Sequence, residues 1–203
     1  MKLSVKPGKG NKVHVYIDDE YRCTVDADYW YSEKWHKLKE VDEDELAALE
    51  SAVSFRRAFN AGMNILSYRP HGKKELINKL VSKKHDRASA EKAADRLEEL
   101  KLVNDRNFAD MLTRHLNENK GYSKKRIMQE LLRRGIDRET AEEAVSALDK
   151  NGEERIIELL EKKYSRYLGD EKGRKRVYNA LLRLGYGYGE INSALKKFEE
   201  GEY

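Results

Sequence analysis

Apolar residues recur at helical spacing through most of this chain, and one arrangement of them appears three times. Ile127 and Leu131 stand four residues apart on one predicted helix, and the next predicted helix has apolar residues at i, i+3, i+4 and i+7. The three sets are Leu76 and Leu80 with Ala90, Ala93, Ala94 and Leu97; Ile127 and Leu131 with Ala141, Ala144, Val145 and Leu148; and Val177 and Leu181 with Ile191, Ala194, Leu195 and Phe198. A further apolar segment precedes each set, so the pattern predicts three tandem units of three helices.

The residues between these apolar positions are repeated as well. The three copies are KKELINKLVSKKHDRASAEKAADRL at 73–97, KKRIMQELLRRGIDRETAEEAVSAL at 124–148 and RKRVYNALLRLGYGYGEINSALKKF at 174–198, a period of about 50 residues. Gly135 and Gly185 are predicted to end a helix in the left-handed conformation. Asp86 and Asp137 then cap the helix that follows. Lys84 occupies the glycine position in the first copy, which predicts a turn of different construction there.

The first 39 residues follow a strand pattern instead. KVHVYI at 12–17 and YRCTV at 21–25 alternate β-branched or aromatic residues with polar ones on either side of a short acidic turn, which predicts a small antiparallel β-hairpin. The expected fold is therefore mainly α, with three tandem three-helix repeats preceded by a β segment. The predicted parts are the β segment 1–39, a connecting helix 40–60, and repeats at 61–104, 105–151 and 152–203.

Composition changes this picture in one respect, the thickness of the core. Charged residues make up 38% of the 203 residues and hydrophobic ones 39%, which predicts a narrow core and an elongated body. The net charge of +4 says little about nucleic acid by itself. A single cysteine, Cys23, excludes an internal disulfide, and no apolar run approaches the roughly 20 residues needed to cross a bilayer. We expect a cytoplasmic monomer that does not bind membranes.

Residue patterns typical of catalysis are not found. The five histidines are scattered without metal-ligand spacing, and Cys23 has no evident base partner. GKGNK at 8–12 lacks the spacing of a phosphate loop. We therefore predict a protein that is not an enzyme, with no catalytic residue, no cofactor and no metal site.

Several stretches together resemble the RecX family, regulators of the RecA recombinase. The stretches are YIDDEYRCTVDAD near the start, AGMNILSYRPHGKKELINKL at 61–80, LEELKLVNDRNFADML at 97–112 and KGYSKKRIMQELLRRGI at 120–136. The resemblance implies tandem three-helix units that bind in the groove of a RecA filament and damp its growth, its ATP hydrolysis and strand exchange. One departure is Gly72, where the family commonly has a capping serine; Glu75 is expected to keep the acid of a capping box there.

One helix face could carry this function. If Ile127 and Leu131 face the core, a rotation of about 100° per residue places Lys125, Arg126, Gln129 and Arg133 together on the opposite side. The third repeat has the same chemistry at Lys175, Arg176, Asn179 and Arg183. In the first repeat the equivalent positions are Lys74, Glu75, Asn78 and Ser82, where Glu75 offsets the charge of Lys74 and of the preceding Lys73. The face is either a solvated helix exterior or a binding surface, and its recurrence favours binding.

The partner of this face is left open between DNA phosphates inside a recombinase filament and acidic protein surface along the filament groove. Few aromatic residues lie on the face, so neither base stacking nor sequence specificity is expected. DNA binding by the chain alone should be weak and non-specific. Two alternatives to a RecA regulator remain: a general nucleic-acid-binding protein acting on free DNA or RNA, and a helical-repeat scaffold for another protein.

Overall fold

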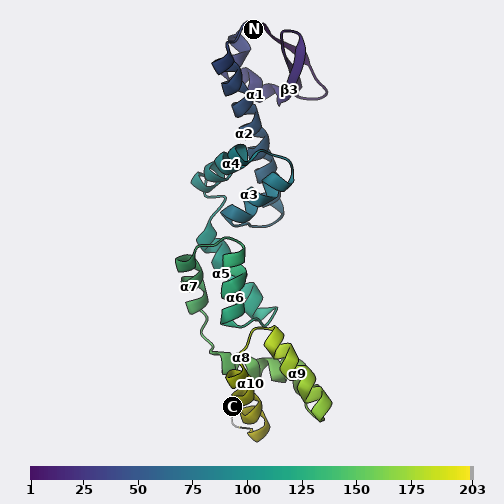
Figure 1. The fold of residues 1–203 in the computed structure, drawn as a ribbon, viewed down its shortest axis with the longest axis vertical. Helices are drawn as coiled ribbons and strands as arrows, with labels where there is room; N and C mark the ends of the chain where they lie inside the picture. Colours follow the sequence, from purple (N-terminus) through teal and green to yellow (C-terminus); the bar gives the residue numbers. More distant parts are fainter. Residues whose placement is uncertain (202–203) are drawn as a thin grey trace. The chain divides into compact units, whose positions relative to one another are not determined.

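The computed structural model describes residues 1–201, which form two compact units. The first unit contains Met1–Ile65 and Lys79–Leu97, and the second contains Leu66–Asn78 and the chain from Glu98 onward. The ribbon in Figure 1 follows the chain through the elements of each unit. Among the described residues, no helix has both the length and the apolar character needed to cross a membrane.

The first unit opens with a three-stranded antiparallel sheet. Its strands are β1 (Leu3–Pro7), β2 (Lys12–Ile17) and β3 (Glu20–Asp26), in the order β1-β2-β3. The predicted hairpin is confirmed, and Asp18 and Asp19 form its turn with φ of 49° and 65°. β1 was not predicted, because only Leu3 of this strand is buried and its alternation is too short to recognise.

One core joins the sheet to the helices that follow it. These are the short α1 (Ala27–Ser32), the 3-10 turn η1 (Lys34–Lys37) and α2 (Glu43–Tyr68). Trp30 and Trp35 pack with Val15, Leu49 and Val53, all almost fully buried. The long helix α2 runs without a break through the predicted connecting helix and the first helix of the first repeat, since its 26 residues contain no proline or capping glycine.

Two more helices complete the first repeat, α3 (Lys73–Ser82) and α4 (Arg87–Glu99). The expectation of a different turn at Lys84 is wrong. Lys84 takes the left-handed conformation with φ of 71°, and His85 donates its backbone N–H to Leu80 as in a glycine-terminated helix. Asp86 caps α4 by accepting from the Ser89 N–H at 2.8 Å, as predicted.

The second repeat consists of α5 (Asp105–Glu118), α6 (Lys124–Arg133) and α7 (Arg138–Ser146), which pack on one another. Phe108, Ile127 and Leu131 lie in its core. Gly135 follows α6 with φ of +88°, and Asp137 accepts from the Thr140 N–H at 2.9 Å, so both predicted helix ends are confirmed.

The third repeat consists of α8 (Gly152–Leu159), α9 (Glu171–Arg183) and α10 (Tyr188–Glu200). A π-helical turn, η2 (Leu160–Tyr164), and a 3-10 turn, η3 (Ser165–Tyr167), extend α8. Ile156, Val177, Leu181 and Ile191 form the core, where α8 packs against α10. Gly185 ends α9 with φ of +93°, as predicted.

Candidate partner-binding surface and the joints between repeats

Helix α6 presents most of its predicted polar face to solvent. Lys125, Gln129 and Arg133 are exposed, whereas Ile127 and Leu131 on the other side have no exposed surface. Arg133 forms an ion pair with Glu130 at 2.8 Å, and its side chain still keeps 70% of its surface exposed. The three polar side chains are therefore available to a partner.

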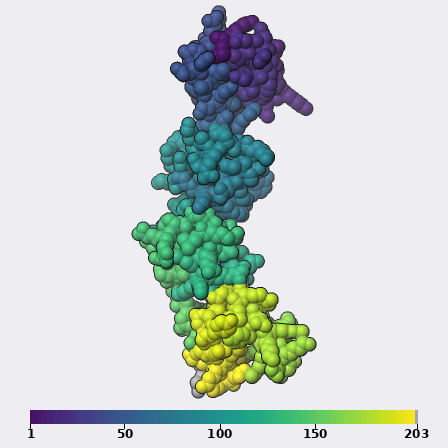
Figure 2. Space-filling model, viewed as in Figure 1, coloured from purple at the N-terminus to yellow at the C-terminus, as the bar shows by residue number. Residues whose placement is uncertain are grey.

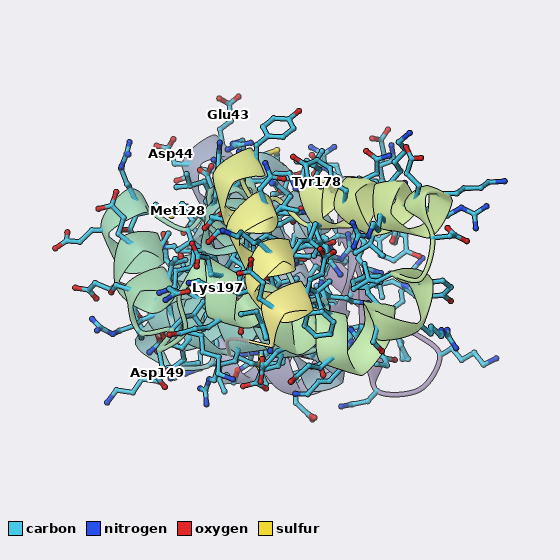
Figure 3. All side chains as sticks on the ribbon, turned by 90° about the horizontal axis from the view of Figure 1, so that it is seen from below. Glu43, Asp44, Met128, Asp149, Tyr178 and Lys197 are labelled. Atoms are coloured by element: carbon cyan, nitrogen blue, oxygen red, sulfur yellow. The ribbon has the colours of Figure 1, made fainter. Side chains whose placement is uncertain are left out.

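Helix α9 repeats this arrangement with more exposed charge. Lys175, Arg176, Asn179 and Arg183 are all exposed, opposite the buried Val177 and Leu181. Lys175 pairs with Glu171 at 2.7 Å, and both side chains are about three-quarters exposed or more, so the pair is weak. Figure 3 shows both nitrogen-tipped and oxygen-tipped side chains around α9, the helix that carries the labelled Tyr178.

Lys73 and Lys74 at the start of α3 both contact other parts of the second unit. Lys73 Nζ donates to Glu98 at 2.7 Å. The aliphatic stem of Lys74 lies against Gly135, where a Cβ atom would approach Lys74 Cβ to 2.6 Å. The ammonium of Lys73 is thus engaged by Glu98, whereas Lys74 remains an exposed residue.

Arg126 differs from the other predicted residues of α6 and α9 because it is partly buried. Its guanidinium lies 4.3 Å from the centre of the Tyr122 ring, and a Cβ at Gly185 would lie 2.7 Å from Arg126 Cβ. Arg126 therefore helps hold the second and third repeats together. Its counterpart Arg176 on α9 is exposed.

The second unit contains two joints at equivalent positions of the repeats. In the first joint, residues 69–75 meet residues 105–136; in the second, residues 117–126 meet residues 155–186. In both, the turn after a repeat's middle helix, at Gly135 or Gly185, packs on the start of the preceding repeat's middle helix. The sequence repeat thus corresponds to a repeated joint as well as to a repeated bundle.

The first joint is polar. Glu75 accepts from Arg69 Nη2 at 2.7 Å and from Arg134 Nη1 at 3.4 Å. Burial raises the pKa of the Glu75 carboxyl. The hydrogen bond and charge of Arg69 lower it, with smaller contributions from His71 and Arg134. The lowering is the larger effect, so the pKa of Glu75 lies below its usual value. At the start of α3, Asp105 accepts from the Lys73 N–H at 2.7 Å, while the carboxylate of Glu75 accepts from the two arginines.

The second joint relies on backbone groups. The Ser123 N–H donates to the Leu184 carbonyl at 2.9 Å, and the buried Tyr186 hydroxyl donates to the Gly121 carbonyl at 3.1 Å. Arg155, which is 9% exposed, donates to the Asn117 carbonyl at 2.5 Å at the end of α5. Figure 2 shows the green surface of the second repeat directly against the yellow surface of the third.

An ion cluster surrounds Arg155 at this joint. Glu158 accepts from both Arg155 and Lys150, the latter at 2.5 Å. The Lys150 hydrogen bond, supported by Arg155, lowers the pKa of Glu158 to about 2 against the opposing effect of burial. Glu158 therefore remains ionised at all ordinary pH values and neutralises part of the charge on Arg155.

Two observations concern metal-binding and nucleophilic side chains in residues 1–201. That part of the chain has no group of three or more His, Cys, Asp or Glu residues positioned to hold a metal. Burial raises the pKa of the Cys23 thiol, with the Arg57 charge opposing it, and a raised pKa disfavours the reactive thiolate.

Sequence reasoning found the helix faces and missed the joints. The four-residue spacing of Ile127 and Leu131 predicts that they face the core of the repeat. It does not predict that Arg126 packs on the next repeat. One signal was present in the sequence. Glu75 and Arg134 have opposite charges, whereas the equivalent residues one repeat later are Arg126 and Leu184. This change in charge suggests that the two positions meet.

Comparison with known proteins agrees with this architecture. Family profiles described as the first, second and third three-helix domains of RecX match residues 58–97, 104–145 and 151–195. The protein named Regulatory protein RecX from Clostridioides difficile is 32% identical over 97% of this chain and 93% of its own length. A protein of the same name from Bacillus subtilis is 26% identical over 98% of this chain and 76% of its own length.

Two crystal structures show the same fold. One, titled regulatory protein RecX, has a TM-score of 0.67 at 19% identity, covering 96% of this chain and 98% of that chain. The other, RecX from Lactobacillus salivarius, has a TM-score of 0.60 at 28% identity, covering 73% of this chain and 99% of that chain.

Proposed function

Because this chain belongs to the RecX family of regulatory proteins, we propose that it binds in the groove of a RecA–DNA filament and inhibits recombinase ATPase activity, filament extension and strand exchange. One observation carries the proposal: exposed cations recur at equivalent positions of α6 and α9, in two repeats that are joined to each other. A filament repeats the same subunit along its length, and a protein with repeated contact groups suits such a partner.

The cations have distinct roles in this proposal. Lys125 and Arg133 on α6, with Arg183 on α9, contact DNA phosphates or acidic side chains that line the groove. Lys175 and Arg176 extend the charge at the start of α9. The amides of Gln129 and Asn179 add hydrogen bonds that carry no charge. Lys73 and Lys74 contribute least, since both already contact other parts of the chain.

The second joint supports the proposal by fixing the two cationic helices relative to each other. Backbone and buried side-chain hydrogen bonds hold the turn at Gly185 against α6. A surface whose groups are already in place loses less conformational entropy on binding. The same joint would be unnecessary for a protein whose repeats bound independently.

Co-sedimentation with RecA filaments tests the proposal. The protein should sediment with filaments formed on single-stranded DNA with an ATP analogue and much less with DNA alone. The general nucleic-acid-binding alternative predicts equal recovery with DNA whether recombinase is present or absent. Equal recovery would therefore reject the filament as the specific partner.

The remaining parts of the proposal follow from the same family assignment. Relatives are named regulatory proteins, and we propose that this chain acts by binding, as a cytoplasmic monomer without catalysis or cofactor. We also propose repeat boundaries at 61–104, 105–151 and 152–203. Limited proteolysis tests the boundaries, since cleavage between repeats should precede cleavage within α5 or α6.

A further inference from the structure

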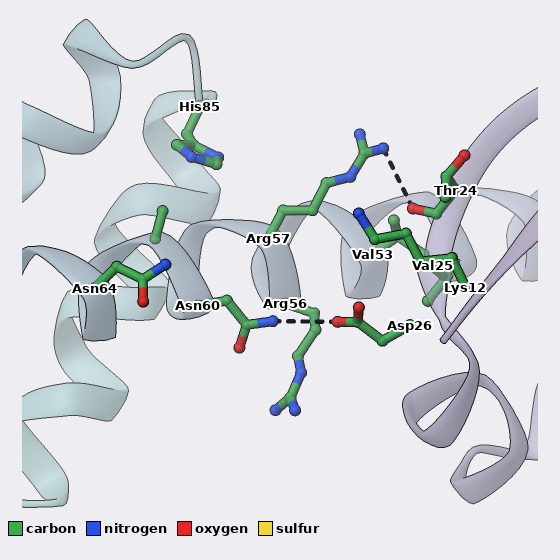
Figure 4. A pocket seen from close by; sticks show the side chains of 11 residues that line it. Lys12, Thr24, Val25, Asp26, Val53, Arg56, Arg57, Asn60, Asn64 and His85 are labelled. Atoms are coloured by element: carbon green, nitrogen blue, oxygen red, sulfur yellow. Dashed lines mark hydrogen bonds between the residues drawn. The ribbon is translucent and has the colours of Figure 1, made fainter. Parts of the chain in front are cut away.

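A cleft of about 400 Å³ runs along α2 in the first unit, between the sheet and the loop from α3 to α4 (Figure 4). Helix α2 contributes a stripe that includes Arg56, Arg57 and Asn60, spaced as neighbours on one helix face. Lys12 comes from β2, and His85 comes from the loop. The cleft is remote in sequence from the cations of α6 and α9, and the function proposed above does not use it.

The charge of this cleft is unbalanced. Lys12, Arg56 and Arg57 line it, and within residues 1–201 no carboxylate lies at ion-pairing distance from any of the three. The one acidic lining residue, Asp26, accepts a hydrogen bond from Asn60 at 3.3 Å. By contrast, Arg22 on the neighbouring strand β3 is paired with Glu50 at 3.5 Å.

Both arginines are held in place with donors to spare. Arg57 Nη2 makes one long hydrogen bond, 3.3 Å, to the Thr24 carbonyl, which leaves most of its five N–H groups unused. The Arg56 guanidinium lies 5.2 Å from the centre of the Tyr29 ring, and its buried Nε has no hydrogen-bond acceptor in the described chain. Figure 4 shows Arg57 and His85 on one side of the cleft and Arg56 on the other.

We propose that this cleft is a binding site for a phosphate group. Phosphate offers negative charge and several acceptor oxygens in different directions, which matches guanidinium, amide and imidazole donors placed on two sides. A planar carboxylate has two oxygens and would use only one side of the cleft. The cleft has room for more than a single phosphate, so a larger molecule that carries a phosphate group fits there. The two sources are a free nucleotide and the backbone of a nucleic-acid strand.

Nuclear magnetic resonance titration tests this site in the full chain. Inorganic pyrophosphate, a mononucleotide and a short oligothymidylate are added separately at constant ionic strength. We expect saturable shifts of the Asn60 side-chain amide and the His85 ring. The double variant Lys12→Gln with Arg57→Gln should weaken binding by about tenfold or more, since two charged hydrogen-bond donors are lost. Arg22→Gln removes one paired cation of the same sheet, which matches the single variant Lys12→Gln in net charge, and should bind like the parent.

The three probes distinguish a free phosphate compound from a nucleic-acid strand, and some results would overturn the proposal. Tight binding of pyrophosphate or the mononucleotide indicates a free phosphate compound, and much tighter binding of the oligonucleotide indicates a strand. Lys12→Gln alone, a change at an exposed side chain, provides the test if the double variant unfolds, and it should weaken binding measurably. Shifts that never saturate, or that persist unchanged in the Lys12 variants, overturn the proposal. An oligoglutamate that binds as tightly as the phosphate probes also overturns it, because the cleft would then be a carboxylate site.

Discussion

Arg134 of the second repeat donates a hydrogen bond to Glu75 of the first, with 3.4 Å between Nη1 and Oε1. The second joint lies at the equivalent position one repeat later, but a backbone hydrogen bond is found there: the Leu184 carbonyl accepts from the Ser123 N–H. The Arg134–Glu75 contact therefore depends on charge, whereas the Ser123–Leu184 and Tyr186–Gly121 hydrogen bonds of the second joint are neutral. Salt should act on these two kinds of contact differently.

Removing the charge of Glu75 tests the first joint. Glu75→Gln should lower the free energy of unfolding by about 1 kcal/mol, since one partly buried carboxylate loses two arginine partners. Added salt should reduce the difference between variant and parent. Tyr186→Phe is the control at the second joint: it removes the hydrogen bond to Gly121 at a similar cost of about 1 kcal/mol, and salt should leave that difference unchanged. Urea unfolding at low and high salt measures both, and a salt-independent Glu75→Gln effect would contradict the ionic account.

The turn at Lys84 provides a second prediction. Lys84 has φ of 71°, a conformation that costs a side-chain-bearing residue about 1 kcal/mol and costs glycine almost nothing. Lys84→Gly should therefore raise the free energy of unfolding by about 0.5 kcal/mol after the added chain entropy is subtracted. Gly185→Ala makes the reverse change and should cost about 1–3 kcal/mol, because its new Cβ also meets Arg126. Thermal unfolding of the two variants checks the opposite signs.

The ion cluster at Glu158 predicts a pH dependence. Its pKa is about 2 in the folded chain and 4.5 as a free side chain, so its contribution to stability is complete above pH 4.5 and is lost as the pH falls toward 2. Glu158→Gln should lower the free energy of unfolding by about 1 kcal/mol near neutral pH, a value that allows for the water still reaching the pair. The difference from the parent should shrink steadily below pH 4.5. A difference that stays constant down to pH 3 would show that Lys150 and Arg155 do not hold this carboxylate.

Much of the fold could be predicted because its determinants are local. The spacing of Ile127 and Leu131 identifies the buried side of α6, and the capping residues Asp86 and Asp137 set helix starts through bonds to residues three positions on. Strand β1 escaped prediction because its partner β2 supplies most of its hydrogen bonds and its own apolar pattern is short.

The joints escaped prediction because they depend on contacts between distant residues. Arg126 looks like any exposed helix cation until the turn at Gly185 packs on it, 59 residues later. At Lys84 a different turn was predicted because lysine is unsuited to the left-handed conformation. Lys84 nevertheless adopts that conformation, since the hydrogen bonds that end the helix are kept. Tertiary context overrides local preference in both places.

The last prediction concerns the cations of α6 and α9. Changing Lys125, Arg133, Lys175, Arg176 and Arg183 to glutamate replaces attraction for phosphates or acidic groove residues by repulsion. Inhibition of the RecA ATPase should be lost, while the melting temperature should move little because all five side chains are exposed. Arg126 is left unchanged, since its contact with Tyr122 and Gly185 supports the second joint and its loss would confuse unfolding with loss of binding.

A variant with the same change in net charge on other exposed positions separates a specific surface from a general charge effect. Glutamate at Lys9, Lys37, Lys83, Lys92 and Lys101 gives this control, since all five are exposed and lie outside the cationic faces of α6 and α9. Long-range repulsion from the DNA acts on net charge and would weaken both variants equally, whereas contact through α6 and α9 weakens only the first. If the first variant stays folded and inhibits as well as the parent, the cations of α6 and α9 are not the contact surface, and the filament must be met by another face of the chain.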